Sequence, residues 1–419
     1  MKTDIAIIGG GAAGLAAALK ATGDNIHVLV IEREKDLGGI LNQCIHNGFG
    51  LQVFKEELTG PEYSTRVIQA FHEQHIQFLA HTTVTEIQKE ENFILYASSE
   101  EHGLMKIEAK AVILSSGCYE RTRGAVQIPG DRPAGIMPAG SAQRYLNIDG
   151  YLVGKKVFIL GSGDIGLIMA RRMTLEGAKV LGVAEIMPYS NGLTRNIVQC
   201  LHDFDIPLYL SHTVTNITGK ERLETITIQE VDETYQPIPK TEKTFDVDTL
   251  LLSVGLIPDT VVLDQLKPVM SPITKSVIVN QFYETSVQGL FVCGNALHVH
   301  DLVDWVTKES EKAGMYAKQY VLDTQEKSTH VSSVNPGKNI RYIIPQLIDF
   351  DQLVEPIEML FRVTKKVETG IFKVSQNHQL IKQKKAKYVA PAEMEHLILN
   401  PEDFIDQSPI TLDFEEVDG

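Results

Sequence analysis

The chain has 419 residues, of which 43% are hydrophobic and 22% are charged, so we expect a globular protein with two or three domains. Its formal net charge of −15 argues against a nucleic-acid-binding protein, because such a protein needs a positive surface that neutralises phosphates. No run reaches the roughly 18 consecutive apolar residues of a transmembrane helix, so we expect no membrane insertion.

Four cysteines, at positions 44, 118, 200 and 293, lie far apart and form no CxxC pair. This spacing excludes a local redox disulfide and a zinc ribbon, and it gives no sign of a secreted disulfide scaffold. The apolar run 12–19 follows a predicted strand and a glycine turn rather than a basic segment, so it is not typical of a signal peptide. We therefore expect a cytoplasmic protein.

The first residues have the pattern of a βαβ unit. Residues 4–8 form a short apolar run that predicts a buried parallel strand, and the glycine-rich segment 9–14 follows at once. An alanine-rich helix is predicted over 15–20, and the apolar run 27–31 predicts a second strand that ends in Glu32.

Each glycine of this GxGxxG segment has a separate physical role. Gly9 permits the tight turn, Gly11 lets a pyrophosphate approach the backbone, and Gly14 lets the helix pack closely on the strand. The helix N-terminus offers unpaired N–H groups to the phosphates. Glu32 stands where a carboxylate can accept the hydroxyls of an adenosine ribose. The segment therefore predicts a dinucleotide site.

A second copy of the same order begins about 150 residues later. The strand 156–160 leads into the glycine segment 161–166, then a helix over about 167–176 and a strand over 179–184 that ends in Glu185. Two such copies indicate a repeat at the scale of domains. The acid at the end of the second strand favours NAD over NADP, because a 2′-phosphate would meet a like charge there.

Other short apolar runs fill the rest of the first 325 residues. Alternating segments predict antiparallel strands over 84–99 and 104–107, and a helix is predicted over about 302–321. Three buried strands are predicted to end in or contain glycine: 111–117, 249–258 and 289–294.

The pattern changes after about residue 327. Prolines at 336, 345, 356 and 391 separate short apolar runs, which predicts a small β domain. The lysine-rich run 382–387 is typical of a solvated strand edge that discourages pairing, with docking of an acidic partner as the alternative.

The order of these motifs resembles that of the pyridine nucleotide–disulfide oxidoreductase-like flavoproteins with two dinucleotide-binding domains. That group includes thioredoxin reductases, disulfide reductases and the large subunits of amine, opine and cyanide-forming dehydrogenases. The resemblance covers about residues 1 to 325. Beyond the two glycine segments it rests on Gly38-Gly39, Ser116-Gly117, Gly255-Leu256-Ile257-Pro258-Asp259 and Gly289-Leu290-Phe291-Val292-Cys293-Gly294-Asn295.

The resemblance implies an α/β fold with two Rossmann-like dinucleotide-binding domains of the three-layer ββα type, followed by the small C-terminal β domain. The expected bounds are residues 1–124 and 259–327 for a discontinuous FAD-binding domain, 125–258 for the NAD-binding domain and 328–419 for the C-terminal domain.

The resemblance also implies FAD at the first glycine segment and NAD(H) at the second. The family's last signal usually ends Gly-Asp, but this chain has Asn295, whose amide can hydrogen-bond a ribityl chain without charge. The implied cofactor-binding residues are Gly9, Gly11, Gly14, Glu32, Arg33, Gly38, Gly39, Ser116, Gly117, Gly294 and Asn295 for FAD, and Gly161, Gly163, Gly166, Glu185 and Gly255 for the nicotinamide dinucleotide.

The redox cysteine pair of the disulfide reductases is missing. Thioredoxin reductases carry CxxC where this chain has residues 138–143, which contain no sulfur, and glutathione-reductase-like enzymes carry a pair beyond the double glycine, where this chain has Cys44 alone. A dithiol relay is therefore not expected. Cys44 either packs in the core or faces the flavin as a catalytic candidate.

His298 and His300 are the other catalytic candidates. They follow Gly294-Asn295 directly and are expected at the start of a helix, either to assist proton transfer at the flavin edge or as solvated residues of a helix cap. No second group of ligands is readable in the sequence, so no metal site is expected. Arg121 and Arg123 either clamp an anion between the domains or are solvated.

Two narrower resemblances concern function. Residues 118–121, 128–135 and 139–143 are similar to the FAD/NAD subunits of sarcosine-oxidase-alpha-like, opine and hydroxyproline dehydrogenases. Residues 39–46 and 299–304 most resemble a bacterial branch associated with glycerol-3-phosphate dehydrogenase-like flavoproteins.

We therefore expect an FAD-dependent oxidoreductase that transfers a hydride between NAD(H) and FAD and exchanges electrons with a partner dehydrogenase subunit. Direct oxidation of an amine or hydroxy acid at the flavin is one alternative. A non-catalytic redox-sensing or assembly flavoprotein is another. Homo-oligomer formation stays open.

Overall fold

The computed structural model describes residues 1–322 and 330–417. The chain forms two compact units. Unit 1 comprises Met1–Asn42, Asn47–Cys118 and Pro258–Gly419, and unit 2 comprises Gln43–His46 and Tyr119–Ile257. The expected boundary between the FAD-binding and C-terminal domains, at 327/328, lies outside the described residues.

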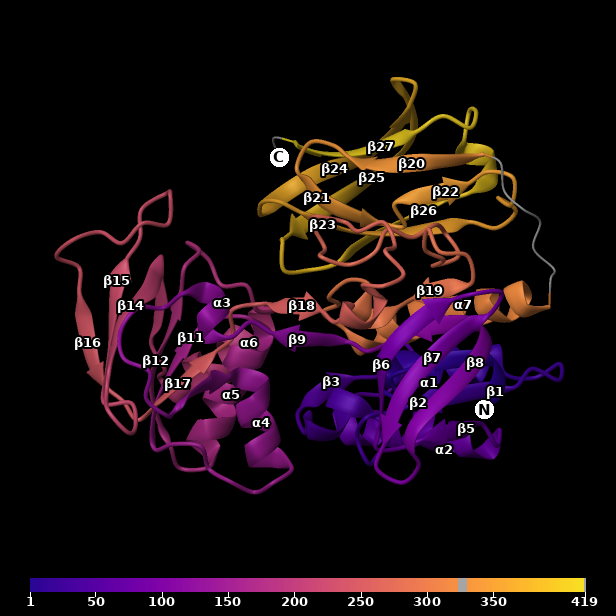
Figure 1. The fold of residues 1–419 in the computed structure, drawn as a ribbon. Helices are drawn as coiled ribbons and strands as arrows, with labels where there is room; N and C mark the ends of the chain where they lie inside the picture. Colours follow the sequence, from indigo (N-terminus) through magenta and orange to yellow (C-terminus); the bar gives the residue numbers. More distant parts are fainter. Residues whose placement is uncertain (323–329, 418–419) are drawn as a thin grey trace. The chain divides into compact units, whose positions relative to one another are not determined.

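Unit 1 contains a seven-stranded mixed sheet in the order β5-β2-β1-β8-β7-β6, with β19 paired to β8 (Figure 1). Pairing is parallel among β5, β2, β1, β8 and β19 and antiparallel from β8 to β7 to β6. Strands β2 and β19 are apolar and fully buried, as strands covered on both faces must be, whereas β5 at the edge of the sheet is largely exposed. The strands are β1 (Lys2–Ile8), β2 (Val28–Ile31), β5 (Gln77–Leu79), β6 (Thr82–Lys89), β7 (Phe93–Ser99), β8 (Gly103–Leu114) and β19 (Leu290–Val292).

Three helices accompany this sheet: α1 (Ala12–Ala21), α2 (Gly60–Glu73) and α7 (Val303–Val321). Helices α1 and α7 pack against each other, and small side chains allow them to approach closely. A Cβ placed on Gly314 of α7 would lie 2.1 Å from the carbonyl oxygen of Ala17. The shorter elements of this region are η1 (Gly39–Gln43), β3 (Asn47–Phe49), β4 (Leu58–Thr59), η3 (Val261–Leu263) and η4 (Gly294–Ala296).

Unit 2 has three layers built around a five-stranded parallel sheet in the order β10-β17-β11-β12-β13. Alternate residues of β11 divide between two apolar cores. Val157 and Ile159 pack with the helices, whereas Phe158 and Leu160 pack with the antiparallel strands β14, β15 and β16. This arrangement is the expected ββα layering, and it follows from the alternation of side chains along a strand.

The elements of unit 2 alternate between strands and helices as far as β13, and strands alone follow up to β17 (Figure 1). In chain order they are α3 (Arg123–Val126), β10 (Ile136–Pro138), α4 (Ala139–Asn147), β11 (Lys156–Leu160), α5 (Asp164–Leu175), β12 (Lys179–Glu185), α6 (Thr194–Cys200), η2 (His202–Phe204), β13 (Leu208–Leu210), β14 (His212–Thr218), β15 (Thr225–Glu230), β16 (Lys243–Asp246) and β17 (Thr249–Leu252).

The strand predicted over 249–258 is interrupted. Strand β17 ends at Leu252. A separate strand, β18 (Leu256–Pro258), pairs with β9 (Cys118–Glu120). Gly255 lies in the break with a φ of 103°, a left-handed conformation that ends a regular strand. The chain passes from one unit to the other along these two short strands.

Residues 330–417 are built from strands. One sheet has the order β22-β20-β27-β24-β25 and a second has the order β21-β23-β26, with an apolar core that includes Phe361, Phe372 and Phe414. The lysine-rich run lies on β25, an edge strand as expected, where Lys382 pairs with Asp403. The strands are β20 (Val331–Pro336), β21 (Ile340–Ile344), β22 (Leu347–Asp349), β23 (Ile357–Val363), β24 (Val367–Gln376), β25 (Gln379–Val389), β26 (Glu395–Leu399) and β27 (Ile410–Glu416), with η5 (Pro401–Asp403) before the last.

The fold class is therefore confirmed as α/β with parallel sheets. Within the described ranges, no helix combines the length and the apolar character that a membrane crossing would require.

The close contact of α1 with α7 gives a prediction. Gly314→Ala would force a Cβ against the Ala17 carbonyl, so we expect the free energy of unfolding of unit 1 to fall by about 1–3 kcal/mol. The measurement is urea denaturation followed by the fluorescence of Trp305, the only tryptophan in the chain, which lies on α7.

Gly124→Ala is the matched control, because a Cβ there meets only Thr122 Oγ1 at 3.8 Å. Equal midpoints for the two variants would contradict the close packing of α1 and α7.

Candidate dinucleotide-binding sites

The first glycine turn lies between β1 and α1. Gly9 has a φ of 104°, and a Cβ on it would lie 2.5 Å from the carbonyl oxygen of Ser115. A Cβ on Gly14 would lie 1.8 Å from the Gly9 oxygen. Protein packing alone therefore requires glycine at both positions.

Gly11 is different, because its side-chain position is open. The nearest atom to a Cβ placed there is Gly39 Cα, at 3.9 Å, and the φ of −77° suits any residue. No contact within the described part of the chain therefore requires glycine at this position. Open space above the middle glycine is what the close approach of a pyrophosphate needs.

The N-terminus of α1 carries no side-chain cap. Its N-cap is Gly11, and its first turn contains no acidic residue. Helix α2 shows the usual alternative, since Thr59 and Glu62 form a complete capping box there. The unpaired N–H groups and the positive end of the α1 dipole therefore suit a phosphate.

Glu32 lies buried at the end of β2, and the first glycine turn holds it by a hydrogen bond. Its Oε2 accepts the Gly10 N–H at 2.6 Å, and its Oε1 accepts the Glu34 N–H at 2.8 Å. Each oxygen keeps a further lone pair, so the carboxylate can also accept ribose hydroxyls.

The double glycine lies against the first turn. The Gly38 N–H donates to the Gly10 oxygen at 2.9 Å, and a Cβ on Gly39 would lie 3.0 Å from Gly11 Cα. The structure thus brings together two motifs that the sequence separates by about 25 residues. Arg33, also expected at this site, is exposed.

The remaining motifs of unit 1 lie at the same sheet edge, because β1, β8 and β19 run parallel and end together. After β8, the Ser115 hydroxyl donates to the Ile8 oxygen at 2.9 Å, and the Ser116 hydroxyl donates to the Asp259 oxygen at 2.6 Å. Gly117 follows with a φ of 78° and open space at its Cβ position. Ligands of open parallel sheets bind at such carboxyl ends.

Gly294 and Asn295 follow β19 at this edge. The Asn295 side chain is used at both ends, since Oδ1 accepts the His300 N–H at 3.0 Å and Nδ2 donates to Cys118 Sγ at 3.6 Å. Its amide therefore fixes the local backbone.

The second glycine turn, between β11 and α5, repeats the first within unit 2. A Cβ on Gly161 would lie 2.0 Å from the Ser253 oxygen, and one on Gly166 would lie 2.6 Å from the Gly161 oxygen. Gly163 again has room, because Ser253 Oγ is its nearest neighbour at 3.4 Å. The N-cap of α5, Gly163, has no side-chain hydrogen bond.

Glu185 holds this turn as Glu32 holds the first. Its Oε2 accepts the Ser162 N–H at 2.9 Å and the Ser162 hydroxyl at 2.7 Å, and its Oε1 accepts the Met187 N–H at 3.0 Å. One further acid is present here: Asp164 begins α5, and its Oδ1 accepts the Leu193 N–H at 2.8 Å. Gly255, the last expected nucleotide residue, accepts the Arg121 N–H at 3.0 Å.

The residues present therefore fit a dinucleotide at each turn. In both turns the outer glycines are required by the protein's own packing, whereas the middle glycine is the N-cap of the helix and keeps free space beside it. In α5 the Ser253 hydroxyl accepts the Gly166 N–H at 3.1 Å.

Cys44 lies in the segment that clusters with unit 2, where its thiol donates to Gln143 Oε1 at 3.8 Å. The Gln43 amide contacts the same oxygen at 3.0 Å. Burial raises the pKa of Cys44 to about 12, so the group is a neutral thiol at physiological pH rather than a nucleophilic thiolate.

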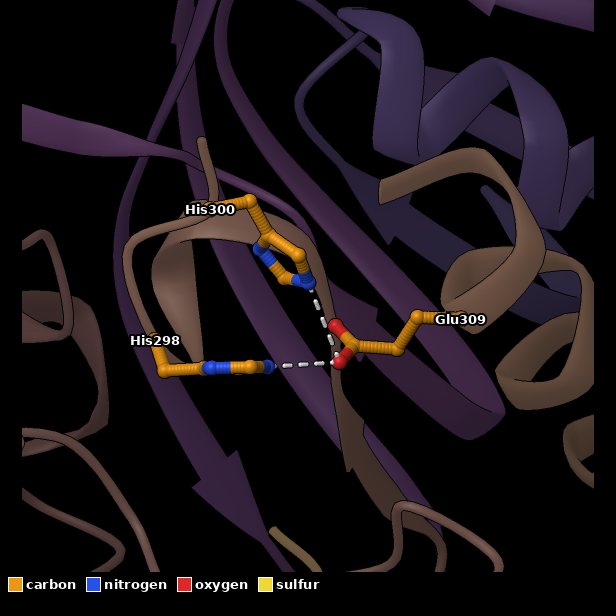
Figure 2. Close-up of side chains that lie close together, drawn as sticks. All are labelled: His298, His300 and Glu309. Carbon is orange, nitrogen blue, oxygen red and sulfur yellow. Dashed lines mark hydrogen bonds and ion pairs between the residues drawn. The ribbon is translucent and has the colours of Figure 1, made fainter. Parts of the chain in front are cut away.

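His298 and His300 do not open a helix, which corrects the expectation from sequence. They lie in the segment between η4 and α7, and Glu309 of α7 points at both (Figure 2). Glu309 Oε2 lies 2.8 Å from His298 Nε2 and 3.4 Å from His300 Nε2. Glu309 Oε1 accepts the N–H of Gly294 at 2.7 Å.

Electrostatics make this cluster unusual. Burial, together with the neighbouring His300, lowers the pKa of His298 to about 4. Burial also opposes ionisation of Glu309, but the two imidazoles outweigh burial and hold its pKa at about 2. The carboxylate is therefore charged inside the protein.

Arg123 contacts backbone carbonyl oxygens of the loop that follows it. Its guanidinium donates to the carbonyl oxygens of Ile128 at 3.1 Å and Gly130 at 2.9 Å, and it also contacts the Asp131 carbonyl. It stabilises its own loop.

Sequence reasoning missed Ser115, Ser253 and Glu309. The serines could have been found, because Ser115-Ser116-Gly117 and Ser253-Val254-Gly255 follow equivalent strands of the two repeats. Glu309 carries no such signal, since it is one of several acids along a helix.

Comparison with known proteins agrees with this geometry. The family model described as "Pyridine nucleotide-disulphide oxidoreductase" matches residues 3–318. The hydrogen cyanide synthase subunit HcnB of Pseudomonas protegens is 24% identical over 64% of this chain and 59% of its own length. An opine oxidase subunit of Agrobacterium tumefaciens is 23% identical over 61% of this chain and 53% of its own.

The alpha subunit of sarcosine oxidase from a Corynebacterium species is 25% identical over 61% of this chain and only 26% of its own length. The chain therefore spans between a quarter and three fifths of these curated relatives.

Among solved structures, thioredoxin reductase of T. acidophilum is similar with a TM-score of 0.63 and 22% identity, covering 77% of this chain and 99% of that one. Bacillithiol disulfide reductase from Bacillus cereus gives a TM-score of 0.62 at 18% identity, and the match covers 78% of this chain and 100% of that one. These likenesses concern the fold.

The two backbone hydrogen bonds to Glu32 give a prediction. Glu32→Gln leaves one carbonyl oxygen where two carboxylate oxygens accept N–H groups, so one buried N–H loses its acceptor. We expect the free energy of unfolding, measured through Trp305 fluorescence on dialysed protein without added dinucleotide, to fall by about 1–3 kcal/mol.

Glu57→Gln, at an exposed position, is the control. A change at Glu32 as small as that control, within about 0.5 kcal/mol, would mean that the turn does not depend on the carboxylate.

Proposed function

Because the chain belongs to the pyridine nucleotide-disulphide oxidoreductase family, we propose that it is an oxidoreductase that transfers a hydride between NAD(H) and FAD. Members of this family and its relatives use FAD and NAD(P). The observation that carries the proposal is the duplicated turn, in which an open middle glycine is the N-cap of a helix in each unit.

We assign FAD to the turn in unit 1, because the double glycine packs against that turn and Asn295 follows β19 at the same sheet edge. The residues proposed to hold FAD are Gly9, Gly11, Gly14, Glu32, Arg33, Gly38, Gly39, Ser116, Gly117, Gly294 and Asn295.

The nicotinamide dinucleotide is assigned to unit 2, at Gly161, Gly163, Gly166, Glu185 and Gly255. The Glu185 carboxylate favours NAD over NADP. It is buried, and three hydrogen bonds keep it at the end of β12. A 2′-phosphate beside it would meet a like charge that cannot easily move away.

Bound FAD would supply the hydride chemistry, and the task of the polypeptide is binding and orientation. The two helix N-termini would hold the pyrophosphates, and Glu32 and Glu185 would fix the adenosine riboses. Hydride transfer itself needs no acid or base from the protein. Cys44, as a neutral thiol, is not required by this scheme.

The electron partner is proposed to be another protein subunit. The curated relatives are themselves called subunits, of hydrogen cyanide synthase, opine oxidase and sarcosine oxidase. The resemblance of residues 39–46 and 299–304 favours a glycerol-3-phosphate dehydrogenase-like partner.

A second candidate is direct oxidation of an amine or hydroxy acid at the flavin. It is favoured by the names of the relatives, since opine and sarcosine are both amines.

The spectrum of the purified protein separates these candidates. For the leading proposal, the protein should be yellow and should bleach anaerobically on addition of NADH, more readily than with NADPH. Bleaching by an amine or hydroxy acid in the absence of NADH would support the second candidate. An oxidised spectrum that persists with NADH would reject the first.

The two middle glycines give a matched pair of substitutions. In Gly11→Ala, the methyl group would occupy the space proposed for the FAD pyrophosphate, so we expect affinity for FAD to fall about tenfold or more. In Gly163→Ala, we expect full FAD content but flavin reduction that needs about tenfold more NADH.

Both positions have extended backbone and room for a methyl group, so neither change should strain the fold. FAD content and the NADH dependence of bleaching are measured on both variants. Loss of FAD from Gly163→Ala with retention in Gly11→Ala would reverse the assignment of the two sites.

A further inference from the structure

The segment before α7 and the middle of α7 bring two histidines and a glutamate together inside unit 1 (Figure 2). One ligand-type atom from each of His298, His300 and Glu309 lies within 4.8 Å of the other two. We propose that these three side chains bind one divalent transition-metal cation. This proposal does not rest on the dinucleotide sites or on hydride transfer.

The donor set suits such a cation. Two imidazole nitrogens and one carboxylate oxygen are ligands that Zn²⁺ and Fe²⁺ accept, at bond lengths of about 2.0–2.2 Å. Tetrahedral bonds of this length place neighbouring ligand atoms about 3.4 Å apart. The distances from Glu309 Oε2 to the two Nε2 atoms, 2.8 and 3.4 Å, are close to that spacing before any adjustment.

The backbone holds the histidines in place. They are two residues apart, and both rings turn toward the carboxylate in Figure 2. Between them, the Val299 carbonyl oxygen accepts a hydrogen bond from Arg362 at 3.1 Å, and the His300 N–H donates to Asn295 at 3.0 Å. The site is thus formed without a large rearrangement.

Glu309 is oriented by a partner of its own. Its Oε1 accepts the Gly294 N–H at 2.7 Å, which directs Oε2 toward the histidines. Metal-binding carboxylates are characteristically held by such outer hydrogen bonds.

A simple hydrogen bond from His298 to Glu309 does not account for His300. Over residues 1–322 and 330–417, neither ring nitrogen of His300 forms a hydrogen bond, although its side chain is 1% exposed and its Nε2 lies 3.4 Å from Glu309 Oε2. A neutral imidazole keeps one N–H and one lone pair, so both polar atoms of His300 are buried without a hydrogen bond. A cation between the side chains would bind the Nε2 lone pair.

The buried negative charge of Glu309 also supports a bound cation. The Glu309 side chain is also 1% exposed, and over residues 1–322 and 330–417 no lysine or arginine forms an ion pair with it. Arg362, the nearby cation, is directed to Asp301 at 3.7 Å and to backbone carbonyls. A buried carboxylate needs a positive partner, and a divalent cation would provide one.

The test is the metal content of the full-length protein. It is expressed with added zinc, purified, analysed for bound elements and then titrated with ZnCl₂ after chelation. We expect one Zn²⁺ per chain, and Zn X-ray absorption should show two imidazoles and an oxygen ligand at about 2.0–2.2 Å. His300→Ala and Glu309→Gln should each weaken Zn²⁺ binding by about 100-fold or more.

His81→Ala is the matched control, because His81 forms a similar pair with Glu100 on the surface. It should bind Zn²⁺ like the unaltered protein. If the variants in the cluster fail to fold, the absorption spectrum of the unaltered protein decides, since two imidazole ligands identify the site.

Substoichiometric zinc with no saturable binding would overturn the proposal, as would a spectrum with sulfur ligands. Equal affinity in His300→Ala and His81→Ala would also overturn it. Flavin content and bleaching by NADH are recorded separately, so failure of the metal site and failure of the hydride-transfer proposal are distinguishable.

Discussion

Each glycine turn must press a helix against a strand and yet keep space open at the N-terminus of that helix. The first demand explains Gly9 and Gly161, where any side chain would collide with the carbonyl oxygen of Ser115 or Ser253. The second demand explains the lack of side-chain caps on α1 and α5. A helix end without a side-chain cap costs stability unless another group satisfies its N–H groups, and in α5 the Ser253 hydroxyl satisfies only that of Gly166.

The acid at the end of the neighbouring strand is part of the same construction. Glu32 and Glu185 each bind the N–H that follows the first glycine and the N–H two residues beyond themselves. The carboxylate therefore ties the turn to the strand. In the second turn the Ser162 hydroxyl adds a third bond to Glu185, which makes that charge the more firmly fixed of the two.

The strand–turn–helix units could be predicted from sequence because spacing within about 30 residues determines them. The pairing of β19 with β8 could not, since it joins residues 290–292 to residues 112–114, and no local pattern encodes a partner at that separation. That pairing nevertheless carries Gly294 to the sheet edge where Ser115 lies. Cys44 illustrates the same limit, because its neighbour Gln143 lies about 100 residues away. Short motifs therefore indicate which residues belong to the candidate sites. Only the pairing of distant segments determines which of these residues lie close together.

Asn295 and Glu309 together explain how a departure from the family pattern fits this fold. The resemblance leads one to expect a carboxylate at position 295, but the amide there binds the His300 N–H through its oxygen and Cys118 through its nitrogen. An aspartate could not make the second bond as a donor. The negative charge lies instead on Glu309, behind the same turn, where it accepts the N–H of Gly294 and faces two imidazoles. The turn is thus held by an amide on one side and by a buried carboxylate on the other, and changing either would alter the backbone at the carboxyl end of β19.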